Sequence, residues 1–233
     1  SHIIPTHIHV DHGGGSGYLA HQLPNIKVVV HPRGAPHMTE PSKLVSATEV
    51  VFGKDFEQRF GPIMPVAAKQ LHEVKDGDTI HLGNRDLTVL HTPGHASHHI
   101  SIWDNLTEGI FPGEALGYIP TDMPDFPLPA CVPPFDLPLY VQSIDRLASI
   151  SPKMVYYSHS GARRDPKVLI NVVRENTLAF GQIVEKSLKD GKSQQEIWNL
   201  LSDYVRERQP EAQLPQEFQL TVSAFLSYFS QQK

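Results

Sequence analysis

The chain contains 233 residues, of which 39% are hydrophobic and 19% charged, and its formal net charge is −5. This composition favours a folded domain over a disordered chain, and the mild negative charge argues against the basic surface of a nucleic-acid-binding protein. The longest aliphatic run, residues 26–30, is interrupted by Lys27 and is far shorter than the ~20 residues of a membrane-spanning helix, so we expect no membrane association.

Cysteine and histidine are unevenly used. Cys131 is the only cysteine, which excludes an intramolecular disulfide and is typical of a reducing compartment, so we predict a cytoplasmic protein. Of the 14 histidines, 13 lie in the first 99 residues. This concentration indicates metal or proton chemistry in the first half of the chain.

The first half of the chain alternates short apolar runs with turn residues, a pattern typical of strands. Residues 26–30 predict a buried strand, and residues 79–82 and 86–91 flank a turn and predict a hairpin. Further strands are expected at 99–103 and 109–111. Helices are expected at 13–23 and over parts of 42–60.

A proline-rich stretch follows. Residues 112–138 contain eight prolines, with Met123, Phe126, Leu128 and Phe135 between them. Proline disfavours regular structure, so we expect a long, stiff, apolar loop. Such a loop is either a surface connector or a lid or wall of a pocket.

The last part of the chain predicts helices, interrupted by a short strand at 153–157. Apolar residues recur on one helical face between 167 and 189, and Ser193 with Glu196 forms a capping box that opens a second helix. A third helix carries apolar residues from Phe218 to Phe229. These apolar faces pack either in the core or in an interface between two copies of the chain, so a homodimer is one of the two expected arrangements.

The segment from Thr6 to Gly15 places four ligand-type side chains within six residues, followed by glycines. In an extended chain His7 and His9 share one face, so both can reach one metal ion. Asp11 and His12 come where the chain turns, so they can point at a second ion. Glycines allow the backbone to make that turn closely.

This His-x-His-x-Asp-His pattern is similar to the signature of the metallo-β-lactamase-fold superfamily of metal-dependent hydrolases. The resemblance covers roughly residues 2–161. Three later motifs of that superfamily occur in order, each at the end of a predicted strand: His91-Thr92-Pro93-Gly94-His95, Phe111-Pro112-Gly113-Glu114 and Tyr157-Ser158-His159-Ser160-Gly161. The resemblance is closer to the glyoxalase II-like and lactonase-like members than to the nucleases.

The resemblance implies an α/β fold of the αββα-sandwich type, with the metal site at one edge of the sheets. It places the catalytic domain at 1–164 and a C-terminal helical extension at 165–233. Several strands precede the first motif in this superfamily, whereas here the motif begins at residue 7. We therefore expect the N-terminal strands to be absent from the sequence.

The resemblance also assigns ligands. His7, His9 and His95 would bind a first metal ion, and Asp11, His12 and His159 a second. Glu114 stands where the superfamily usually has a bridging aspartate, so its longer side chain bridges both ions, binds one, or lies beside them. His98 and His99 follow the third motif and are expected to lie behind the ligands or on the surface. His91 is expected to be structural.

Imidazole and carboxylate ligands suit two divalent ions, with zinc preferred and iron or manganese as alternatives. A hydroxide shared by two such ions is a nucleophile at neutral pH, and Asp11 would orient it or shuttle a proton. We therefore expect a hydrolase of an ester, thioester or lactone, acting on a small molecule with an apolar acyl portion. Two alternatives remain open: an iron-dependent oxygen or sulfur redox enzyme, and a metal-containing ligand-binding protein without hydrolytic activity.

Overall fold

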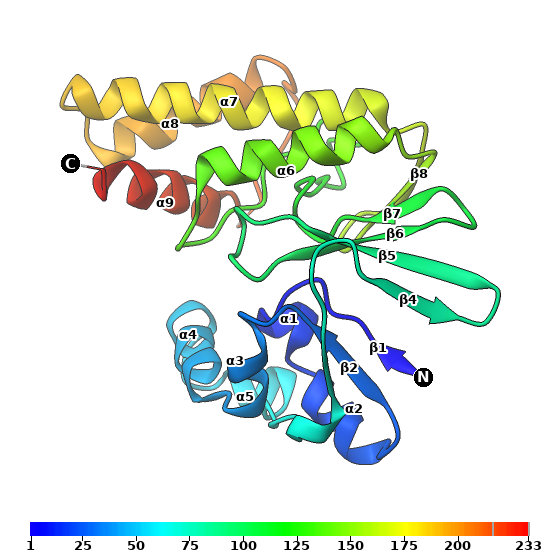
Figure 1. Ribbon diagram of the computed structural model, residues 1–233. Coiled ribbons are helices and arrows are strands. Elements are labelled where there is room, and N and C mark those ends of the chain that lie inside the picture. Colours follow the sequence, from blue (N-terminus) through cyan, green and yellow to red (C-terminus); the bar gives the residue numbers. More distant parts are fainter. Residues whose placement is uncertain (216, 233) are drawn as a thin grey trace. The chain divides into compact units, whose positions relative to one another are not determined.

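The computed structural model describes residues 1–215 and 217–232 and shows a mixed α/β fold (Figure 1). Its strands form two sheets, of order β1-β2-β3 and β4-β5-β6-β7-β8-β9. The helices α7, α8 and α9 follow the last strand in the chain. The predicted fold class, a mixed α/β fold with a helical C-terminal part, is thus confirmed.

The chain folds into two compact units. The first contains residues 1–91 and 97–102, and the second contains residues 92–96 and the chain from Trp103 onward. Strand β6 (Ile100–Asp104) contains the boundary between them. The short segment 92–96, which carries His95, therefore belongs to the second unit. The domain division predicted after residue 164 stays a prediction.

The first unit is organised around the buried strand β2. Its three-stranded sheet is parallel, with β2 between β1 and β3. Val28 and Val30 pack in one apolar cluster with Ile8, whereas Val29 faces a second cluster on the other side of the strand. Because both faces of β2 are covered, its sequence is a continuous run of valines rather than an alternation. The elements of this unit are β1 (His2–Ile3), α1 (Val10–Gly13), α2 (Ser16–Gln22), β2 (Lys27–Val30), α3 (Ala35–Thr39), α4 (Ser42–Phe52), α5 (Phe56–Phe60), the short 3-10 helix η1 (Ala68–Gln70), β3 (Leu71–Glu73), β4 (Thr79–Leu82) and β5 (Arg85–His91).

Most of the predicted elements of this unit are confirmed. The hairpin is present, with Thr79 opposite Thr88 and Leu82 opposite Arg85, and α4 and α5 occupy the region 42–60. The helix predicted at 13–23 is wrong in its start and continuity. The first helical turn begins at Val10, and a break at Gly14 and Gly15 separates it from α2.

In the second unit, helices pack along one another and beside a small strand group. The elements are β7 (Gly109–Phe111), α6 (Leu137–Ile150), β8 (Met154–Tyr157), β9 (Gly161–Arg164), α7 (Lys167–Lys189), α8 (Gln194–Arg206) and α9 (Glu217–Ser230). Helix α7 contacts α6, α8 and α9 (Figure 1). Strand β7 pairs with β8 in parallel, and β8 with β9 antiparallel.

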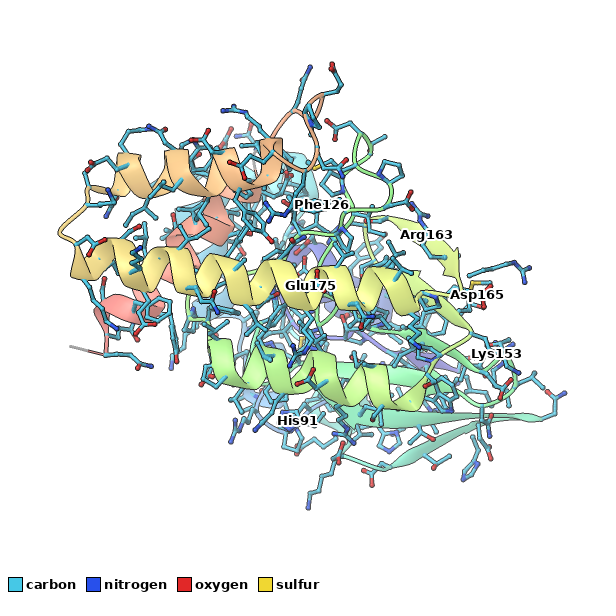
Figure 2. All side chains as sticks on the ribbon, turned by 90° about the horizontal axis from the view of Figure 1, so that it is seen from above. His91, Phe126, Lys153, Arg163, Asp165 and Glu175 are labelled. Carbon is cyan, nitrogen blue, oxygen red and sulfur yellow. The ribbon has the colours of Figure 1, made fainter. Side chains whose placement is uncertain are left out.

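The helical predictions for this unit are confirmed. Helix α7 occupies 167–189, and Ser193 and Glu196 form the capping box that begins α8. Glu175 lies on the exposed face of α7, whereas Val173 and Phe180 are buried (Figure 2). Among the residues that the structure describes, no helix combines the length and the apolar character that crossing a bilayer requires. The homodimer stays a prediction.

Strand β9 was not predicted. It forms a hairpin with β8, and at its open end the Asp165 backbone N–H donates to the Lys153 carbonyl oxygen at 3.1 Å. Lys153, Arg163 and Asp165 mark this hairpin in Figure 2. The sequence of β9 ends in Arg163 and Arg164 and has no apolar alternation, so it carries no strand pattern. The pairing with β8, rather than local propensity, makes it a strand.

The proline-rich loop lacks helix and strand until α6 begins, as predicted, apart from one bridge between Tyr118 and Leu128. It is not a surface connector, because its apolar side chains are buried: Ile119, Met123, Phe126, Leu128 and Phe135. The helices also hold its backbone. Asn176 Nδ2 donates to the Pro127 carbonyl oxygen at 2.8 Å, and Thr221 Oγ1 to that of Pro129 at 3.0 Å. The loop is therefore part of the core of the second unit.

Candidate metal centre

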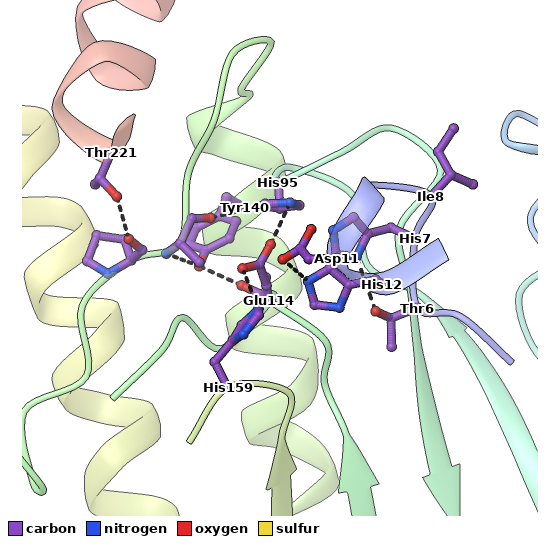
Figure 3. Close-up of polar contacts among 12 residues, drawn as sticks. Thr6, His7, Ile8, Asp11, His12, His95, Glu114, Tyr140, His159 and Thr221 are labelled. Carbon is purple, nitrogen blue, oxygen red and sulfur yellow. Dashed lines mark hydrogen bonds and ion pairs between the residues drawn. The ribbon is translucent and has the colours of Figure 1, made fainter. Parts of the chain in front are cut away.

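The first unit gathers the four ligand-type residues of the N-terminal motif. His7 and His9 lie after β1 in irregular chain, not within a strand, and their rings are 4.5 Å apart. His12 lies in α1 with its ring 4.1 Å from that of His7, and its Nε2 is 3.2 Å from Asp11 Oδ2 (Figure 3). The side chain of His7 is almost completely buried, whereas 43% of the Asp11 side chain is exposed. The four groups thus form a compact donor set.

The segment 97–102 supports this motif from the same unit. The Ile100 backbone N–H donates to the Thr6 carbonyl oxygen at 2.8 Å, and the Ile8 backbone N–H donates to His98 Nε2 at 3.2 Å. His99 is fully buried, and its ring lies 5.1 Å from that of His7. His98 and His99 therefore lie behind the ligand-type residues, one of the two roles expected for them.

In the second unit, helix α6 holds the turn that carries His95. Ser143 Oγ donates to the Pro93 carbonyl oxygen at 2.6 Å, and the Asp136 N–H donates to that of Gly94 at 3.0 Å. Asp136 also caps α6, because its side chain accepts from the Leu139 N–H. The start of α6 and the Pro93–His95 turn are thus fixed to each other.

Glu114 lies between two histidines of the second unit. Its Oε2 is 2.8 Å from His95 Nε2, and its Oε1 is 3.5 Å from His159 Nε2 (Figure 3). His95 Nδ1 is 2.8 Å from the Ala130 carbonyl oxygen. Because a carbonyl oxygen only accepts, Nδ1 carries the proton and Nε2 is left to face Glu114. This is the tautomer that a metal-binding histidine requires.

The structure therefore brings the predicted residues together in two sets. His7, His9, Asp11 and His12 are gathered in the first unit, and His95, Glu114 and His159 in the second. Within each set the donor atoms lie close together, those of His7 and His9 within 4.8 Å and those of His95 and Glu114 at 2.8 Å. Nitrogen and oxygen donors at this spacing fit a divalent metal ion.

Gly94 makes the close approach of the His95 turn to α6 possible. Its φ is +130°, and a Cβ atom there would lie 2.3 Å from Tyr140 Cα and 2.4 Å from Tyr140 N. We expect Gly94→Ala to lower the free energy of unfolding by roughly 3 kcal/mol, since backbone strain and overpacking each cost about 1–3 kcal/mol.

Urea unfolding measures this loss, and Gly191→Ala is the matched control. Gly191 also has a positive φ, of +72°, but a Cβ atom there meets open space. The control should lose only the strain component, about 1 kcal/mol. An equal loss in the two variants would contradict the close contact between Gly94 and Tyr140.

His91 has the structural role expected of it. Its Nε2 is 3.1 Å from the Ser97 carbonyl oxygen, and its backbone N–H donates to Asp76 Oδ1 at 2.8 Å. The His31 ring stacks on the His91 ring with centroids 4.3 Å apart. Burial, followed by the neighbouring His91 and Arg33, lowers the pKa of His31 to about 4.

This pKa predicts acid sensitivity of the first unit. An unfolded histidine has a pKa near 6.5, so between pH ~6.5 and about 4 the unfolded chain binds more protons at His31 than the folded chain does. The free energy of unfolding contributed by this position is therefore present above pH ~6.5 and falls on acidification through that window. We expect His31→Gln to lose less stability than the wild type between pH 7 and pH 4.5, measured by urea unfolding of metal-stripped protein. The exposed His21→Gln is the control, and an unchanged pH slope in His31→Gln would contradict the assignment.

Cys131 is buried, and burial followed by the nearby Glu114 carboxylate raises the pKa of its thiol. A thiol in this setting stays protonated at neutral pH, so it is unsuited to act as a nucleophile.

Tyr140 is a residue of the site that the sequence did not indicate. It is fully buried in α6, and its hydroxyl donates to the Glu114 carbonyl oxygen at 2.8 Å (Figure 3). Its only sequence signal is a place on the apolar face of a helix, which predicts packing and not contact with ligands.

The sequence profile of the metallo-beta-lactamase superfamily matches residues 1–159. This match covers more than half of the chain, and the chain therefore belongs to the metallo-beta-lactamase superfamily. The resemblance noted from the four motifs is thus confirmed.

Three curated relatives are similar in sequence. The metallo-beta-lactamase fold-containing protein ST1585 of Sulfurisphaera tokodaii is 27% identical over 199 residues, which are 84% of this chain and 68% of that protein. The acyl-coenzyme A thioesterase MBLAC2 of Bos taurus is 31% identical over 48% of this chain and 40% of that protein. The hydroxyacylglutathione hydrolase of Legionella pneumophila (strain Lens) is 27% identical over 49% of this chain and 33% of that protein. The chain spans less than half the length of the last two.

Solved structures agree on the fold. TTHA1429 from Thermus thermophilus, a metallo-beta-lactamase family protein, matches with a TM-score of 0.71 and 22% identity over 100% of this chain and 75% of that chain. The archaeal ST1585 structure from Sulfolobus tokodaii matches with a TM-score of 0.68 and 22% identity over 99% of this chain and 80% of that chain. These likenesses confirm the metallo-β-lactamase fold predicted from the sequence.

Proposed function

We propose that this protein is a metal-dependent hydrolase that cleaves an ester, a thioester or a lactone. The observation that carries the proposal is the position of the Glu114 carboxylate, with one oxygen 2.8 Å from His95 Nε2 and the other 3.5 Å from His159 Nε2. A carboxylate placed between two imidazoles is suited to hold two cations close together, because its charge offsets their mutual repulsion.

The ligands follow the superfamily pattern. His7, His9 and His95 would hold a first ion, and Asp11, His12 and His159 a second, with Glu114 shared between the two. The donor set contains imidazoles and carboxylates without thiolate, which fits zinc and equally iron or manganese. When bound, two such ions supply a hydroxide nucleophile at neutral pH and polarise the carbonyl group of the substrate.

The protein's own residues then have separate tasks. His95, with its proton on Nδ1, offers the unprotonated Nε2 atom of a neutral imidazole as a metal ligand. Asp11, partly exposed and 3.2 Å from His12 Nε2, would orient the attacking water and move a proton. Glu114 has a side chain only 15% exposed, so its charge acts in a poorly hydrated place where it is weakly screened.

A thioester is the substrate class that the relatives favour. The two relatives with named activities are an acyl-coenzyme A thioesterase and a hydroxyacylglutathione hydrolase. We extend this to a small molecule with an apolar acyl portion.

The test is hydrolysis by protein loaded in turn with zinc, iron or manganese, on a panel of acyl thioesters, esters and lactones. We expect turnover of at least one thioester that depends on the metal and is lost in Asp11→Asn. Loaded protein that cleaves no compound of the panel would contradict the proposal and favour a ligand-binding role. Oxygen consumption by the iron form without hydrolysis would favour a redox enzyme.

A further inference from the structure

Beyond the ligands themselves, Tyr140 occupies an unusual position in the second unit. Its hydroxyl makes two hydrogen bonds to backbone groups from two separate segments. It donates to the Glu114 carbonyl oxygen at 2.8 Å and accepts from the Ala130 backbone N–H at 3.2 Å. One partner is itself a proposed metal ligand, and the other is hydrogen-bonded to one. Glu114 carries the carboxylate, and the carbonyl oxygen of Ala130 accepts from His95 Nδ1 at 2.8 Å.

We propose that Tyr140 is a positioning residue that sets the His95 imidazole and the Glu114 carboxylate relative to each other. The Tyr140 hydroxyl links the Glu114 carbonyl oxygen to the Ala130 N–H, and the carbonyl oxygen of the same residue, Ala130, accepts from His95 Nδ1. These contacts hold the Glu114 carboxylate oxygen Oε2 and His95 Nε2 at a distance of 2.8 Å from each other.

The surroundings of Tyr140 make this device rigid. The side chain is fully buried, and its ring packs against Phe135 with centroids 5.4 Å apart. Gly94, directly before His95, lies against the Tyr140 backbone, so the residue fixes the His95 turn by contact as well as by hydrogen bonding. Burial and the neighbouring Cys131 raise the pKa of Tyr140, so the hydroxyl keeps the proton that it donates.

A hydroxyl group that served stability alone would not need to hydrogen-bond to residues of the proposed metal centre. Two other phenols of the second unit give that comparison, because the buried hydroxyls of Tyr118 and Tyr157 have no hydrogen-bond partner among the described residues. Tyr157 is as deeply packed as a core residue, with 5% of its surface exposed. Tyr157→Phe is therefore a matched control, since it removes a buried hydroxyl that contacts neither Ala130 nor Glu114.

The inference rests on the proposed metal-dependent function, and its test uses Zn²⁺ alone, without substrate. We expect Tyr140→Phe to weaken Zn²⁺ binding by about 10–100-fold, the range seen when a group that orients a ligand is removed. Affinity is measured in competition with a chromophoric chelator, on protein shown to be folded by circular dichroism. Tyr157→Phe should bind Zn²⁺ as the wild type does.

The outcomes are separable. Wild-type Zn²⁺ affinity in folded Tyr140→Phe would overturn the inference, while absence of Zn²⁺ binding in the wild type would overturn the proposed function instead. If Tyr140→Phe does not fold, long-range nitrogen NMR of the metal-free wild type decides. The proton of His95 is expected on Nδ1, with the Ala130 amide strongly protected from exchange. An Nδ1 atom of His95 without a proton, or an Ala130 amide that exchanges rapidly, would break this set of hydrogen bonds and overturn the inference.

Discussion

Replacing Glu114 by alanine is expected to release the second metal ion first and to lower turnover by about 100-fold or more. This is more than the ~10–100-fold that loss of a ligand-orienting group costs, because Glu114 is itself a proposed ligand. The carboxylate lies 2.8 Å from His95 and 3.5 Å from His159, so its removal leaves two cations without the anion that offsets their repulsion. The fold should be retained, because Tyr140 holds the backbone carbonyl of Glu114 and not its side chain. Metal analysis and steady-state kinetics measure both effects.

Glu114→Asp is the conservative variant, since it restores the carboxylate that the superfamily usually has at this position. It should keep two ions, with a changed spacing and metal preference, because aspartate is one methylene shorter. If Glu114→Ala retains two ions and wild-type turnover, the carboxylate is a neighbour of the site and not a bridge.

Removal of metal is expected to have the largest effect on the whole protein. A chelator should abolish hydrolysis and lower the apparent free energy of unfolding by about 4 kcal/mol, the gain from a ligand present at ~1,000 times its Kd. The ions would bind the folded chain and not the unfolded chain, so their removal takes away the stabilisation that binding supplies. Urea unfolding with and without chelator, followed by addition of Zn²⁺, measures the change and its reversal.

A variant with His7 and His9 both replaced by alanine is the matched control for metal removal. Its stability should respond to the chelator less than that of the wild type, because it lacks two of the proposed ligands of the first ion and keeps those of the second. Identical unfolding curves of the wild type before and after removal of its ions would contradict the structural role of the metal.

The parts of the site that lie close together in sequence were predictable. His7, His9, Asp11 and His12 fall within six residues, and the structure gathers them in one unit. Glu114 was predictable by a different route, as a carboxylate after the strand at 109–111 in the place of the superfamily's aspartate. These metal-ligating residues could be recognised in the sequence because metal binding needs particular side chains, and few residue types supply them.

The supports of these donors were not predictable, because they are made by backbone groups and by ordinary core residues. The partner of His95 Nδ1 is the carbonyl oxygen of Ala130, 35 residues away, and any residue type provides that atom. Tyr140 looks like one more apolar position of a helix. The eight prolines correctly indicated an irregular loop, but they gave no sign that helices α7 and α9 would hold it by its carbonyl groups.

The errors in the predicted secondary structure also arise from features that the local sequence does not encode. Strand β9 depends on pairing with β8, a tertiary contact that outweighs the weak strand propensity of its own residues. The turn that carries Asp11 and His12 is a short helix beginning at Val10, three residues before the predicted start. A four-residue helix leaves too little apolar periodicity to be recognised in sequence.

Anomalous diffraction at the zinc edge, from crystals of the metal-loaded protein, tests the binuclear centre most directly. Two peaks are expected ~3.5–4 Å apart, the spacing typical of two-metal sites. One peak should be ligated by His7, His9 and His95, the other by Asp11, His12 and His159, and the Glu114 carboxylate should contact at least one of them. A single peak away from these residues, or fully loaded protein with no peak among them, would contradict the proposed centre and the hydrolytic function built on it.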